Sequence, residues 1–146
     1  EVFQFFDEED GIAHDLRSRH VNAYVKRAMG EEFSAKDFRT WGGTLIAANE
    51  LLGVDPGELE TASGRAAAAR RVVKEVAERL GNTPAVAKAS YIDPRVLEAA
   101  EDPELLARVR RARARMRPRR HFGVEEQSTL ALLAETGRRA RRRGRR

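Results

Sequence analysis

The chain of 146 residues has no cysteine, which excludes disulfide bonds and thiolate metal sites. Its histidines, His14, His20 and His121, lack the spacing of metal ligands, so we expect neither a metal site nor a cofactor. No apolar run approaches the length of a membrane span, and no signal peptide opens the chain. These absences predict a soluble protein of the cytoplasm. Because the chain starts with Glu1 and not with Met, we expect it to be a piece of a longer protein.

Aromatic residues are also scarce, at 6% of the chain, and β-branched residues are few, whereas Ala and Arg are abundant. This balance favours helices over strands. The length suits one compact domain, and hydrophobic residues, at 41%, suffice for a core. We therefore predict a mainly α fold, a compact helical bundle with one short strand over residues 1–6.

Helical periodicity, interrupted by Gly and Pro, locates the expected helices. Ser34 and Asp37 form a near capping box at the start of one of them. Tyr24 falls on the apolar stripe of the first helix, so we expect it to pack in the core. The expected helices cover residues 18–29, 34–52, 61–80, a short helix from 84, another from 94, then 105–116 and 124–136.

Charge is divided unevenly along the chain. Residues 1–100 hold 13 Lys and Arg against 17 Asp and Glu, whereas residues 101–146 hold 15 Arg against 6 Asp and Glu. An arginine-rich segment favours phosphate partners through counterion release, although a solubilising tail would have the same composition. From this shift we predict a helical extension over residues 102–136 and a disordered basic tail over 137–146.

Two side chains could act on a phosphodiester. Arg39 lies near the start of an expected helix, where backbone N–H groups and the helix dipole favour an anion. Its planar guanidinium can bind two oxygens of one phosphate, although a solvated arginine is the simpler interpretation. Tyr91, one of only two tyrosines, carries a phenol that can be a covalent nucleophile when a cation or base assists it. The alternative for Tyr91 is an ordinary half-buried tyrosine.

Three stretches of the sequence carry a resemblance to a known family. They are Val-Asn-Ala-Tyr at 21–24, Phe-Ser-Ala-Lys-Asp-Phe-Arg-Thr-Trp-Gly-Gly-Thr at 33–44, and Leu-Gly-Asn-Thr-Pro at 80–84 with Ser-Tyr-Ile-Asp-Pro at 90–94. In order and spacing they resemble the C-terminal catalytic domain of type IB DNA topoisomerases, in particular the bacterial, poxvirus-like branch. The likeness covers about residues 1–101, the expected catalytic core. It implies the helical fold shared with tyrosine recombinases, without the β-hairpin portion that precedes it in complete enzymes.

The resemblance also implies a reaction. Tyr91 would attack a DNA phosphodiester, form a 3′-phosphotyrosyl link and release a 5′-hydroxyl, which reseals the strand after supercoils relax. Arg39 would stabilise charge at the phosphorus centre. Asn82, at a position that is often His in relatives, would donate a hydrogen bond to a non-bridging oxygen. The reaction uses neither ATP nor a metal, and the implied partner is double-stranded DNA, bound by a monomer in the bacterial nucleoid.

Two members of the family's active site find no match in this chain. They are a second arginine and a general-acid lysine, which lie upstream in the complete enzymes, the lysine on a β-hairpin. Because general acid catalysis contributes about 10² to 10⁴-fold, we expect the chain alone to be weakly active or inactive. Lys36, Thr40 and Lys88 are candidate DNA contacts, and neither lysine matches the hairpin motif.

Two other functions stay open on sequence grounds. Tyrosine recombinases share the fold and the covalent chemistry, but they typically have His where Lys36 and Asn82 stand. A non-enzymatic DNA-binding module is the other alternative, because residues 73–87 fit a helix-turn-helix with a Gly-containing turn. In that case Tyr91 would be structural, and the stretch 36–43 would have no explanation.

Overall fold

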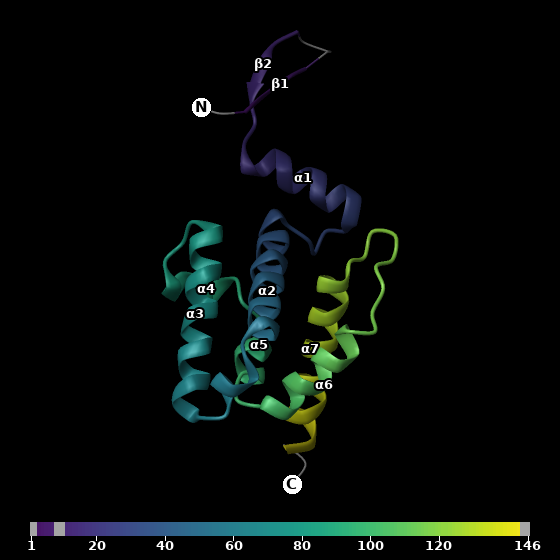
Figure 1. The fold of residues 1–146 in the computed structure, drawn as a ribbon. Coiled ribbons are helices and arrows are strands. Elements are labelled where there is room, and N and C mark those ends of the chain that lie inside the picture. Colours follow the sequence, from purple (N-terminus) through teal and green to yellow (C-terminus); the bar gives the residue numbers. More distant parts are fainter. Residues whose placement is uncertain (1–2, 8–10, 144–146) are drawn as a thin grey trace. The chain divides into compact units, whose positions relative to one another are not determined.

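A computed structural model describes residues 3–7 and 11–143 of the chain. By their internal contacts the residues form two compact units, Glu1–Arg39 and Thr40–Arg146, so the boundary falls within a helix. The ribbon in Figure 1 is made almost entirely of helices, which confirms the predicted mainly α fold. No helix among the described residues combines the length and the apolar character needed to cross a bilayer.

The first unit begins with a small antiparallel hairpin of β1 (Gln4–Phe6) and β2 (Ala13–Asp15). The expected strand is present as β1, while residues 1–2 lie outside the described part of the chain. The second strand was missed because Ala13–Asp15 has little strand propensity of its own. It forms through pairing of Phe5 with His14, whose rings stack with centroids 5.5 Å apart.

Helix α1 (Ser18–Met29) has the predicted bounds, but its apolar stripe is not buried as predicted. Tyr24 is 64% exposed, so its expected place in the core is wrong, and Val25 is the buried residue of this helix. The Tyr24 ring instead lies 5.9 Å from the Arg27 guanidinium, which stacks on its face. Helical periodicity identifies the apolar side of a helix, but a unit of 39 residues offers too little apolar surface to cover that side.

The second unit is a bundle of helices around one apolar core. Its elements are most of α2 (Ala35–Gly53), the 3₁₀ turn η1 (Pro56–Leu59), α3 (Ala62–Leu80), α4 (Pro84–Ser90), α5 (Pro94–Ala99), α6 (Pro103–Arg113) and α7 (Val124–Arg143). Side-chain caps mark several starts: Thr61, Thr83, Asp93 and Asp102 each accept a hydrogen bond from a backbone N–H of the helix that follows. Leu51, Val76 and Val96 share the core with Leu106 and Leu132, so the predicted extension 102–136 packs with the helices before it.

Helix α7 is longer than predicted. We expected disorder from residue 137, but the helix continues through Gly137 to Arg143, and residues 144–146 lie outside the described chain. Buried Thr136 donates to the carbonyl of Leu132, and Arg139 forms an ion pair with Asp102. Positive charge near a helix C-terminus also interacts favourably with the helix dipole. A run of arginines can therefore continue a helix when the turn at its start is held by contacts such as the ion pair of Arg139 with Asp102.

Candidate active site

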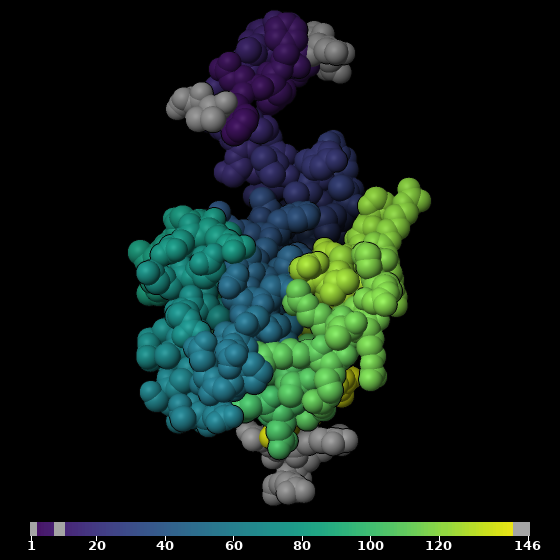
Figure 2. Space-filling view, viewed as in Figure 1, coloured from purple at the N-terminus to yellow at the C-terminus, as the bar shows by residue number. Residues whose placement is uncertain are grey.

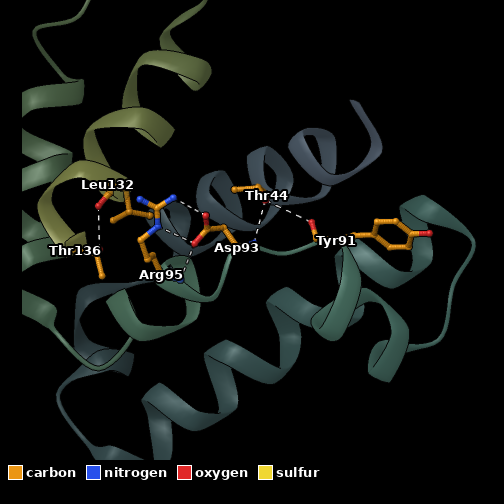
Figure 3. Close-up of polar contacts among 6 residues, drawn as sticks. All are labelled: Thr44, Tyr91, Asp93, Arg95, Leu132 and Thr136. Carbon is orange, nitrogen blue, oxygen red and sulfur yellow. Dashed lines mark hydrogen bonds and ion pairs between the residues drawn. The ribbon is translucent and has the colours of Figure 1, made fainter. Parts of the chain in front are cut away.

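Tyr91 lies in the short link between α4 and α5. Its backbone N–H donates to the carbonyl of Ala87 at 3.0 Å and so ends α4. The next side chain, Ile92, is buried, and Asp93 then begins α5 by accepting from the N–H of Arg95 at 2.9 Å. The link is therefore fixed at both ends, and the half-buried Tyr91 ring projects away from α5 (Figure 3).

Helix α2 contacts this link along one face. The hydroxyl of Thr44 accepts from the N–H of Asp93 at 3.0 Å and donates to the carbonyl of Tyr91 at 3.5 Å. One turn earlier, the hydroxyl of Thr40 donates to the carbonyl of Ser90 at 3.4 Å. Thr40, predicted as a DNA contact, thus also helps to hold the segment that carries Tyr91.

Asn82 occupies the turn between α3 and α4. Gly81 ends α3 with a φ of 64°, and the N–H of Asn82 reaches back to the carbonyl of Ala77 at 2.8 Å. The side-chain amide of Asn82 donates to the carbonyl of Leu80 at 3.0 Å, which fixes its orientation. Asn82 and Tyr91 flank the seven-residue helix α4, about 10 Å long at 1.5 Å per residue.

Arg39 and Lys36 are exposed residues of α2 and belong to the first unit. Half of the predicted capping box is present, since the N–H of Ser34 donates to a carboxylate oxygen of Asp37 at 2.8 Å. The hydroxyl of Ser34 donates to the same oxygen at 2.8 Å, and the N–H of Asp37 bonds to the carbonyl of Ser34 at 3.0 Å. The two bonds from Ser34 to the carboxylate lower the pKa of Asp37. In the second unit Thr40 bonds to the last residue of α4, Asn82 and Tyr91 lie before and after this helix, and the exposed Lys88 lies on it.

An ion pair stabilises the start of α5, two residues after Tyr91. The guanidinium of Arg95 donates to both oxygens of Asp93, at 2.9 and 2.6 Å (Figure 3). The hydrogen bond from Arg95 lowers the pKa of Asp93, although partial burial opposes the shift. The same bond raises the pKa of Arg95.

Because the pKa of Asp93 is lower in the folded chain than its ordinary value, its ionised form favours the fold. This contribution is fully present above the unfolded pKa, about 3.9, and is lost as the pH falls through the folded pKa. In Asp93→Asn the free energy of unfolding should therefore fall less steeply than in the wild type as the pH is lowered. Arg95→Gln should have the same effect. Urea unfolding between pH 6 and 2 measures this effect. If the free energy of unfolding of both variants falls with decreasing pH as steeply as that of the wild type, the prediction is wrong.

Gly43 and Thr44 adjoin the link that carries Tyr91, and sequence reasoning did not single them out. A signal was present, because two consecutive glycines, Gly42 and Gly43, stand inside a helix, where each costs about 1 kcal/mol relative to Ala.

Within the described residues, no group of three His, Asp or Glu side chains could hold a metal ion.

Comparison with known proteins gives two findings. A family model described as "Eukaryotic DNA topoisomerase I, catalytic core" matches residues 2–115. A curated relative, DNA topoisomerase 1B of Acanthamoeba polyphaga mimivirus, is 34% identical over 103 residues. That alignment covers 66% of this chain and 30% of the relative, so the chain spans less than a third of the relative's length.

Proposed function

Because this chain belongs to the family of the eukaryotic DNA topoisomerase I catalytic core, we propose that it takes part in the cleavage and resealing of one strand of duplex DNA. The family expected from the sequence is thereby confirmed. The finer assignment to the bacterial, poxvirus-like branch stays part of the proposal, as do the bacterial nucleoid and the monomeric state. The observation that carries the function is the link between α4 and α5, where Tyr91 is fixed by hydrogen bonds on both sides.

The proposed chemistry is a transesterification at phosphorus. The phenol oxygen of Tyr91 forms a bond to phosphorus, and the bond from phosphorus to the 5′-oxygen breaks. The phenol loses its proton, and the departing 5′-oxygen takes one up to become a 5′-hydroxyl. The reverse attack by that hydroxyl reseals the strand, so neither ATP nor a metal is consumed.

We assign Arg39 to the phosphate that Tyr91 attacks. Arg39 lies on helix α2, four residues before Gly43 in the sequence. Gly43 and Thr44 on that helix adjoin the backbone of the Tyr91 link. A guanidinium bound to that phosphate would stabilise the charge that builds up on two non-bridging oxygens.

Asn82 is assigned as a neutral donor to one phosphate oxygen. Its amide nitrogen carries two hydrogens, and the bond to the carbonyl of Leu80 uses one of them. The second hydrogen can serve a phosphate oxygen, whereas an amide cannot act as a general base. Lys36, Thr40 and Lys88 stay candidates for contacts to other phosphates of the DNA.

The observed hairpin has no lysine that could match the general-acid lysine of the family. Residues 1–16, which include β1 and β2, contain no lysine. A DNA duplex with sulfur in place of the bridging 5′-oxygen removes the need for a general acid, because a thiolate leaves without a proton. Such a substrate isolates the attack by Tyr91 from the action of the acid.

The test uses the full-length protein and this sulfur-bridged duplex. We expect a covalent complex that survives denaturation, with the protein joined to the 3′-phosphate at one end of the break and a free 5′-thiol at the other end. Mass spectrometry of the digested complex should place the nucleotide on Tyr91. Absence of any covalent complex, or attachment at another residue, would overturn the proposed function.

The two alternatives are weaker than the topoisomerase proposal. In a helix-turn-helix, α4 would read base edges, but among its exposed side chains only Lys88 and Ser90 carry hydrogen-bonding groups, whereas Ala85, Val86 and Ala89 have none. A recombinase would need paired recombination sites, so relaxation of a plasmid without such sites would argue against it. Lys36 and Asn82, where recombinases typically have His, also favour the topoisomerase.

Arginines of the second unit support a DNA partner. Residues 105–124 hold eight arginines and no acidic residue. The turn between α6 and α7, coloured green in Figure 2, exposes Arg117, Arg119 and Arg120. Backbone bonds between Arg119 and Phe122, at 2.9 and 3.0 Å, close this turn. Exposed arginines on an ordered turn suit contact with a phosphate backbone.

Removal of residues 140–146 should weaken DNA binding without unfolding the chain. This deletion removes five arginines but retains Arg139 and its ion pair with Asp102. The slope of log K against log salt should fall by about 0.9 for each DNA phosphate that the shortened chain no longer neutralises, and the melting temperature should stay close to that of the wild type. Titration of duplex DNA at several salt concentrations measures the slope. An unchanged slope would mean that residues 140–146 contribute to solubility and not to DNA binding.

A further inference from the structure

The segment that carries Tyr91 is held against α2 by two residues to which the reaction assigns no part. Figure 3 shows Thr44 bonded to both Tyr91 and Asp93, and Gly43 is its neighbour in α2. We propose that Gly43 and Thr44 are positioning residues, which set the place from which the Tyr91 phenol attacks. This inference rests on the proposed role of Tyr91 as the nucleophile.

Thr44 acts through a single hydroxyl. Its side chain is buried at 3% exposure, and the hydroxyl accepts from Asp93 and donates to Tyr91, on either side of buried Ile92. Serine would retain both hydrogen bonds, whereas valine has the same shape but neither donor nor acceptor. Valine would leave the N–H of Asp93 without its acceptor, so the link would lose its fixed distance from α2.

Gly43 acts through the absence of a side chain. A Cβ built on Gly43 would lie 3.1 Å from the Cβ of Tyr91 and closer still to the Tyr91 carbonyl oxygen. A carbonyl group cannot rotate away as a side chain can, so either α2 or the link would have to move. At Gly42, the preceding residue, an added Cβ meets nothing within 4 Å. The two glycines are therefore a matched pair, and only one of them adjoins Tyr91.

These contacts bear on chemistry because of the direction of the Tyr91 side chain. The ring projects away from Thr44, so the position of its hydroxyl depends on the backbone that Thr44 and Gly43 hold (Figure 3). A displacement of about 1 Å between a nucleophile and its target can reduce a rate by roughly 10²-fold. DNA affinity depends on phosphate contacts elsewhere, so we expect the rate of attack to fall while affinity is retained.

The first experiment compares Thr44→Val with Thr44→Ser in the full-length protein. The sulfur-bridged duplex is used at saturating concentration, and the single-turnover rate of covalent complex formation is measured beside DNA affinity and melting temperature. We expect Thr44→Val to slow attack about 10- to 100-fold with unchanged affinity. Thr44→Ser should restore most of the rate. Thr136→Val is the matched control, because buried Thr136 donates within α7, to the carbonyl of Leu132 at 2.9 Å, and among the described residues no bond joins its hydroxyl to the Tyr91 link.

The second experiment compares Gly43→Ala with Gly42→Ala. We expect Gly43→Ala to slow attack at least 10-fold and Gly42→Ala to leave the rate unchanged. If Gly43→Ala does not fold, the Thr44 variants decide. Wild-type rates in folded Thr44→Val and Gly43→Ala would overturn this inference and leave the proposed function intact. A wild-type protein that forms no covalent complex would instead overturn the proposed function.

Discussion

Replacement of Tyr91 by phenylalanine should abolish the covalent complex with DNA altogether. The change removes the phenol oxygen that would bond to phosphorus, and no other atom of the side chain can replace it. The backbone contacts of the link do not involve this oxygen, so the fold and DNA affinity should be retained. Denaturing gel electrophoresis with the sulfur-bridged duplex measures the complex, and a filter-binding titration measures affinity.

Tyr24→Phe is the matched control for this experiment. The chain has only these two tyrosines, and Tyr24 lies on α1 with 64% of its surface exposed. The control should form the complex at the wild-type rate. A complex that persists in Tyr91→Phe and disappears in Tyr24→Phe would identify Tyr24, in the first unit, as the nucleophile. A complex that persists in both would show that neither tyrosine is the nucleophile.

Local signals in the sequence predict most of the second unit. Thr61 and Gly81 delimit α3 because a threonine cap and a left-handed glycine act within one helical turn. Thr83 before Pro84 starts α4 in the same way. Such signals involve residues only a few positions apart, so they can be recognised in the sequence without knowledge of the rest of the fold.

Contacts between distant segments could not be predicted in the same way. The bonds of Thr44 to Tyr91 and Asp93 join residues 47 and 49 positions apart. The sequence marks Gly43 as unusual inside a helix but does not show what approaches it.

The prediction that a side chain is buried can be wrong for a related reason. Tyr24 has the spacing of a core residue, yet the structure leaves it exposed, since periodicity does not reveal whether another element covers that face.

Arg110 is a further residue whose role depends on a distant segment. Helix α2 has no basic residue in its last turn, so its terminal carbonyls need donors from elsewhere. Arg110 of α6 donates to the carbonyls of Leu51, Leu52 and Val54, at 3.3, 2.9 and 2.6 Å. Partial burial of its side chain lowers the pKa of Arg110. The helix that carries Gly43 and Thr44 is thus anchored at its end by α6.

Arg110→Met should lower the free energy of unfolding by about 2 to 4 kcal/mol. Methionine retains much of the apolar stem but has no donor, so the carbonyls of Leu51, Leu52 and Val54 lose the bonds from Arg110, although that of Leu51 still accepts from the N–H of Val54 at 3.3 Å. A loss of this size is a large part of the 5 to 15 kcal/mol typical of a domain, and it should lower the melting temperature by roughly 5 to 15 °C. Arg111→Met is the control, because the neighbouring Arg111 is exposed and should change stability by less than about 0.5 kcal/mol. Urea unfolding compares the two variants, and equal losses would mean that the three carbonyl bonds contribute nothing specific to the end of α2.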